Sequence, residues 1–75
     1  MGKLEEIIAN IFELEPEQIK KEMTPEDIET WDSLSQLNLL STIEKEFKIK
    51  LEFDEIFTVM KIDDIYKLLS KKGVL

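Results

Sequence analysis

The sequence predicts an all-α protein, a four-helix bundle with a short third helix. Two observations indicate this fold: apolar residues recur at helical spacing in four stretches, and a single four-residue stretch alternates like a strand. Four alternating residues without a partner strand cannot make a sheet. With 75 residues, 43% of them apolar, the chain can build one hydrophobic core. We therefore expect one domain over residues 1–75.

The first helix is expected over about residues 3–14. Its apolar residues form one stripe: Leu4, Ile7, Ile8, Ile11 and Phe12. Pro16 is expected to end it, because the ring clashes with the preceding turn. In the long connection that follows, Ile19 and Met23 are expected to turn inward. Thr24-Pro25-Glu26-Asp27 has a capping hydroxyl followed by proline, which predicts one short helical turn.

The second helix is expected to start at Leu34 and to be the best buried. Its predicted stripe comprises Leu34, Leu37, Leu40, Ile43 and Phe47, with Leu39 as a second apolar edge. Residues 48–51 are expected to form an extended link that places Ile49 or Leu51 in the core.

Two shorter helices are expected after this link. The first carries Phe53, Ile56, Phe57 and Val59, and the second carries Ile62, Ile65, Tyr66, Leu68 and Leu69. Gly73 follows the last of these residues, and glycine is the residue most often found just past a helix end.

Composition excludes several functions. The chain has no cysteine and no histidine, which rules out disulfides, thiolate metal sites and His-dependent triads, and we expect no resident metal. Its net charge of −7 without any arginine argues against nucleic acid as a partner. The N-terminus has no apolar signal segment and no stretch is long enough to span a bilayer, so we expect a cytoplasmic protein.

The negative charge is concentrated between residues 13 and 32. This segment has eight acids against two lysines, whereas residues 61–75 have a small excess of lysine. A solvated, solubilising loop is the simplest interpretation, and a docking surface for basic proteins is the alternative.

Trp31-Asp32-Ser33-Leu34 lies where this acidic connection meets the second helix. A serine there places its hydroxyl at the positive end of the helix, which favours an attached phosphate. Asp32 can cap the helix, and it can also help hold a divalent metal that a modifying enzyme brings. Trp31 is expected to be a packing residue. The plainer alternative is that Asp32 and Ser33 only start a helix.

Asp32-Ser33-Leu34 is followed by Leu37, Leu40, Ile43, Glu44, Glu46 and Phe47, and together they resemble the D-S-L…L-E-x-E-F pattern of acyl carrier proteins. The resemblance covers nearly the whole chain. It implies that Ser33 accepts 4'-phosphopantetheine from coenzyme A, which makes the chain a phosphoprotein, with Asp32 and Leu34 beside the arm. The chain would then be a carrier of acyl thioesters and not an enzyme. The rival hydroxyls of Ser35, Ser41 and Ser70 lack the Asp-Ser-Leu context.

The resemblance also implies partners: a phosphopantetheinyl transferase, and acyl-loading, acyl-transfer or condensing enzymes. The partner-binding residues it implies are Leu34, Leu37, Asn38, Glu44 and Ile56. Many fatty-acid carriers have acids where this chain has Ser35 and Asn38, so docking is expected to rely more on apolar groups. A monomer suits a module that passes between enzymes.

The pathway is open among fatty-acid, polyketide and other specialised acyl transfers. The missing acids, and Trp31 before the D-S-L triplet, resemble discrete carriers of specialised pathways, including those of lipopeptides, surface polysaccharides and D-alanine transfer. Peptidyl carriers have Gly and His before the serine, and Thr30-Trp31-Asp32 does not match.

Two other functions remain as alternatives. An acidic helical adaptor without a prosthetic group would keep the bundle and use Asp32-Ser33 only as a cap. A hydrolase with paired carboxylates is the least favoured, because no acids converge from separate elements.

Overall fold

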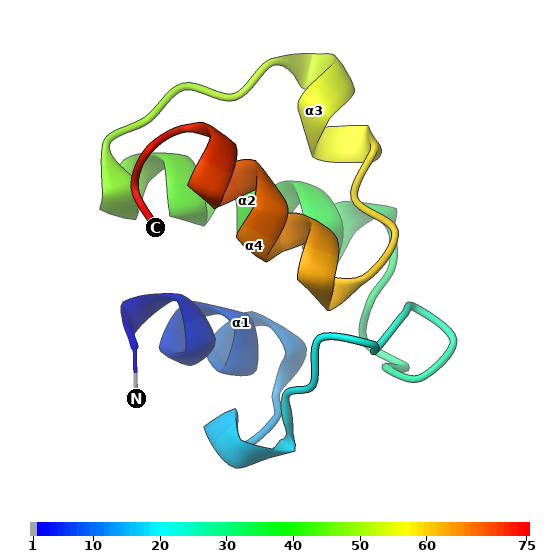
Figure 1. Ribbon diagram of the computed structural model, residues 1–75. Coiled ribbons are helices and arrows are strands. Elements are labelled where there is room, and N and C mark those ends of the chain that lie inside the picture. The colour runs from blue at the N-terminus through cyan, green and yellow to red at the C-terminus, as the bar shows by residue number, and fades with distance from the viewer. Residues whose placement is uncertain (1) are drawn as a thin grey trace.

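The computed structural model describes residues 2–75, and it confirms the predicted all-helical fold. These residues form four α-helices and one 3₁₀ turn, η1, and contain no strand: α1 (Lys3–Phe12), η1 (Pro16–Gln18), α2 (Ser33–Phe47), α3 (Phe53–Phe57) and α4 (Ile62–Lys71). In Figure 1 the orange α4 lies in front of the green α2, the blue α1 lies below them, and the yellow α3 lies above. No helix among residues 2–75 is long and apolar enough to cross a membrane.

The core is built from one face of each long helix. Its largest fully buried side chains are Phe12, Ile8, Leu39, Leu40, Ile43, Ile62, Ile65 and Leu69. Leu51, from the link after α2, is 6% exposed, which confirms that this link fills the core. The Glu44 carboxylate accepts the Leu51 backbone N–H at 2.7 Å and so fixes the link against α2.

The first helix ends earlier, and for a different reason, than the sequence predicted. Glu13 adopts the left-handed conformation (φ 59°) and terminates α1, and the Leu14 N–H closes onto the Ala9 carbonyl at 2.8 Å. Pro16 instead opens η1, where Glu15 and Gln18 cap each other. The predicted turn at Thr24–Asp27 is present, because the Thr24 carbonyl accepts the N–H groups of Asp27 and Ile28.

The connection from residue 19 to residue 32 is fastened at both ends. The Ile62 and Asp63 N–H groups donate to the carbonyls of Met23 and Lys21, both at 2.9 Å, which attaches the connection to the start of α4. Near its other end the Trp31 ring stacks on Phe12 with centroids 5.0 Å apart. Trp31 is 4% exposed, which confirms that it is a packing residue.

Candidate functional site

Ser33 is the first residue of α2, and its side chain is exposed. Within residues 2–75 no hydrogen bond engages its hydroxyl. An exposed, uncommitted hydroxyl at a helix start is open to modification, and the partial positive charge there stabilises an added phosphate. These features fit the attachment of a phosphodiester.

Asp32 caps α2 through a reciprocal pair of hydrogen bonds with Ser35. The Ser35 N–H donates to Asp32 Oδ1 at 2.8 Å, and the Asp32 N–H donates to Ser35 Oγ at 2.9 Å. The pKa of the Asp32 carboxyl is lowered from its ordinary value, chiefly by the Ser35 N–H bond, so the carboxylate stays ionised. Ser35 Oγ also donates to the Thr30 carbonyl at 2.6 Å. The expected cap is confirmed, and it holds the Ser33 backbone in place.

The rival serines differ from Ser33 in position. Ser41 and Ser70 are exposed too, but they lie within α2 and α4, away from the positive N-terminal end of either helix. Ser35 commits its hydroxyl to the cap.

Gln36, one turn after Ser33, links α2 to both neighbouring segments, and the sequence patterns did not identify it. Its side-chain Oε1 accepts the Trp31 indole N–H at 3.1 Å, and its Nε2 donates to the carbonyls of Ile56 at 2.6 Å and Val59 at 3.2 Å. Gln36 is 9% exposed and every polar atom of its side chain has a partner. The available indication was its spacing, three and four residues before Leu39 and Leu40, together with a tryptophan nearby in the sequence.

The predicted stripe of α2 was partly wrong. Leu34 is 76% exposed and Leu37 is 39% exposed, and the buried face instead comprises Gln36, Leu39, Leu40 and Ile43. Leu34 is therefore a protruding apolar side chain directly beside Ser33, as its expected role in docking requires.

The other expected partner-binding residues lie in different environments. Asn38 is exposed on α2. Glu44 is half-buried, with its carboxylate turned to the Leu51 N–H. Ile56 is 6% exposed and belongs to the core, because its side chain faces α2 from the inner side of α3. It offers a partner little surface.

The exposed apolar surface of α3 comes from residues that the expected docking set omitted. Phe53 is 72% exposed and Phe57 is 43% exposed, their rings are 4.9 Å apart, and Met60 just beyond is 71% exposed. Phe53 and Phe57 are four residues apart and share one helix face, a spacing that the sequence does show. Because Gln36 holds the Ile56 and Val59 carbonyls, this end of α3 lies beside the first turns of α2.

The fold and the site together define a small helical carrier domain with an exposed serine at the start of its second helix. The family model for the phosphopantetheine attachment site matches residues 2–69, and the chain belongs to this family. It is a carrier domain of the acyl carrier protein type, and its cofactor is covalently bound 4'-phosphopantetheine. No curated protein matches the chain.

Proposed function

We propose that Ser33 is the attachment point of the 4'-phosphopantetheine arm and that this single carrier domain transports acyl groups as thioesters on the arm's thiol. The supporting observation is the free, exposed Ser33 hydroxyl at the capped start of α2, inside the segment that the family model matches. The chain's own residues position the serine, and the arm supplies the thiol that bears the acyl group.

The acyl chemistry belongs to partner enzymes. A phosphopantetheinyl transferase loads the arm, and acyl-loading, acyl-transfer or condensing enzymes act on the thioester. The exposed side chains of Leu34, Leu37 and Asn38 surround Ser33 and would meet these partners. We place the protein in a specialised pathway, because Ser35 and Asn38 stand where many fatty-acid carriers have acids, and we propose that it works as a cytoplasmic monomer.

Intact mass tests the attachment site. After incubation with coenzyme A and a phosphopantetheinyl transferase, the wild type should gain the mass of one arm and Ser33→Ala should gain none. Ser41→Ala is the matched control and should be loaded like the wild type. Circular dichroism should show both variants folded, since the Ser33 hydroxyl makes no hydrogen bond that the substitution would remove. Arm incorporation by Ser33→Ala would place the site elsewhere, and a wild type that is never loaded would favour the adaptor without a prosthetic group.

A further inference from the structure

Two adjoining hollows follow the seam between α1 and α2 and begin beside Ser33. The first has a volume of about 680 Å³ and is lined by Asp32 and Leu34, the two neighbours of Ser33, and by Leu37 and Asn38 further along α2. The second has a volume of about 510 Å³ and extends along α1 to Lys3. Ile11 lines both hollows, and we call the two together the arm groove.

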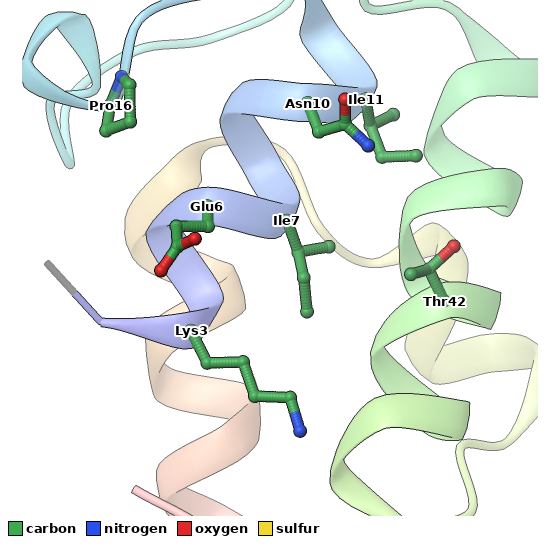
Figure 2. A pocket seen from close by; sticks show the side chains of 7 residues that line it. All are labelled: Lys3, Glu6, Ile7, Asn10, Ile11, Pro16 and Thr42. Carbon is green, nitrogen blue, oxygen red and sulfur yellow. The ribbon is translucent and has the colours of Figure 1, made fainter.

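Figure 2 shows the second hollow, where Ile7 and Ile11 of α1 point toward α2 and Thr42 points from α2 into the space between the helices. In the first hollow Ile11, Leu34 and Leu37 supply the apolar surface. Apolar side chains therefore occur along both hollows of the arm groove, and Ile11 connects them; the charged lining residues are Lys3, Glu6, Glu13 and Asp32.

Three polar side chains of the first hollow make hydrogen bonds within the protein, whereas the side-chain amide of Asn38 makes none. Thr30 Oγ1 donates to the Phe12 carbonyl, and Asp32 and Ser35 cap each other. The side-chain amides of Asn38 in the first hollow and Asn10 in the second have no hydrogen-bond partner within residues 2–75, and both residues are exposed. Each amide can donate one hydrogen bond and accept another.

We propose that the arm groove is the resting site of the 4'-phosphopantetheine arm on its own carrier, an inference that rests on attachment at Ser33. Beyond its phosphate the arm is uncharged and carries two amides and two methyl groups. The methyl groups match the apolar side chains of Ile11 and Leu37, and the two amides match the free amides of Asn38 and Asn10.

The length of the arm agrees with this placement. From standard bond lengths, the extended arm reaches about 18 Å from the serine oxygen to its sulfur. Thr42 lies nine residues after Ser33 on α2, which corresponds to a rise of about 14 Å. The arm therefore spans the first hollow and brings its thiol into the second, where Asn10 and Thr42 meet it.

Chemical-shift comparison of the unloaded and loaded protein locates the arm. Attachment perturbs the first turn of α2 wherever the arm lies, so the diagnostic residues are distant from Ser33. We expect shifts at Ile11, Thr42 and the Asn10 side-chain amide, and nuclear Overhauser contacts between the arm methyls and Ile11. Shifts at Phe53 and Phe57 instead, or none beyond the first turn of α2, would overturn the inference.

Thiol reactivity gives an independent measure. Asn10→Ala combined with Asn38→Ala removes both free amides from exposed positions, so a maleimide should capture the loaded thiol about twofold faster or more than in the wild type. Phe53→Ala with Phe57→Ala is the matched control on α3 and should leave the rate unchanged. Equal rates in all three proteins would contradict the proposal. Intact mass first establishes that each is loaded, so failure of attachment at Ser33 is distinguished from failure of the arm groove.

Discussion

At the residue scale, adjacent side chains of the candidate site have separate roles: some form the helix cap, and one keeps a free hydroxyl. Asp32 and Ser35 satisfy each other's backbone N–H groups, and this leaves the Ser33 hydroxyl without a structural task. A hydroxyl that also held the fold together could not be esterified without a cost in stability. The cap therefore allows Ser33 to be modified without disturbing α2.

Asp32 provides a prediction about stability and pH. Replacing Asp32 by Ala removes the acceptor for the Ser35 N–H and should lower the Tm by about 5 °C, whereas Asp32→Asn retains an acceptor and should lower it less. Because the folded pKa of Asp32 is depressed, its contribution is present above the ordinary value of 3.8 and is lost as pH falls through the folded value.

Thermal unfolding between pH 7 and pH 2 checks both parts. The difference in Tm between wild type and Asp32→Asn should shrink toward the acid end, since the protonated carboxyl and the amide are then both neutral. A difference that is constant with pH would show that the charge of Asp32 contributes nothing to the cap.

At the element scale, α3 is held by contacts that helical periodicity does not reveal. The helix has only five residues, and a helix this short is not stable alone. Ile56 buries against the core, Glu55 Oε1 lies 3.0 Å from Lys72 Nζ at the end of α4, and the carbonyls at its C-terminal end are bonded by Gln36.

Gln36 therefore provides the second prediction. Gln36→Ala leaves the Trp31 N–H, the Ile56 carbonyl in α3 and the Val59 carbonyl just beyond α3 without this partner in a buried place. It should cost about 2 kcal/mol of unfolding free energy, measured in urea. Amide exchange should accelerate in α3 more than in α4, because only α3 loses its attachment.

Gln36→Glu is the matched variant, since it can still accept from Trp31 but cannot donate to the Ile56 and Val59 carbonyls when ionised. It should alter the exchange of α3 and leave the Trp31 fluorescence close to that of the wild type. Equal exchange in α3 for all three proteins would mean that packing of Ile56 alone holds the helix.

The sequence predicted the helices themselves, the buried Trp31 and a link that places Ile49 or Leu51 in the core, because each depends on local spacing or on a large apolar side chain. The structure shows that the buried residue of the link is Leu51. It did not predict which face of α2 is buried. Leu34 and Leu37 share the spacing of core residues, but the neighbouring segments pack on the side of α2 that carries Gln36, Leu39 and Leu40, so both leucines are exposed. The end of α1 was also missed, since Glu13 gives no sign in the sequence that it adopts a left-handed conformation.

The candidate site likewise has a part that the sequence could predict and a part that it could not. The sequence could propose Ser33, Asp32 and Leu34 as site residues, from their tripeptide together with its place at a helix start in a short, acidic chain. The exposed aromatic surface of α3 could not be predicted, because Phe53, Ile56 and Phe57 lie three and four residues apart, close together around the helix, and periodicity does not show which of them meets the core. The Phe53 ring is exposed and Ile56 is buried only because α2 lies on the Ile56 side.

At the scale of the whole molecule, charge and apolar surface are arranged differently around the serine. The chain has a net charge of −7, yet the exposed residues that follow Ser33 on the first turns of α2 are neutral: Leu34, Leu37 and Asn38. Under the proposed function, we expect distant charges to guide the encounter with a basic partner surface, and neutral and apolar groups to make the contact at Ser33.

The last prediction concerns partner choice, and the structure indicates which variant changes the charge without breaking the helix cap. Restoring both acids of many fatty-acid carriers would require Ser35→Asp and Asn38→Glu, but Ser35 Oγ donates to the Thr30 carbonyl at 2.6 Å, which a carboxylate cannot do. Asn38 is exposed and its side chain has no partner within residues 2–75, so Asn38→Glu changes charge without disturbing the cap.

With the arm attached, the wild type should be a poor substrate for a fatty-acid ketosynthase. Asn38→Glu should raise kcat/KM about threefold at low salt, because charge complementarity mainly speeds encounter. Asn38→Gln has the same size as the Glu variant without its charge and should show no gain. The gain should disappear near 1 M salt, where the Debye length is about 3 Å. Rates for the unmodified sequence equal to those of an ordinary fatty-acid carrier would rule out the specialised pathway and leave the carrier function intact.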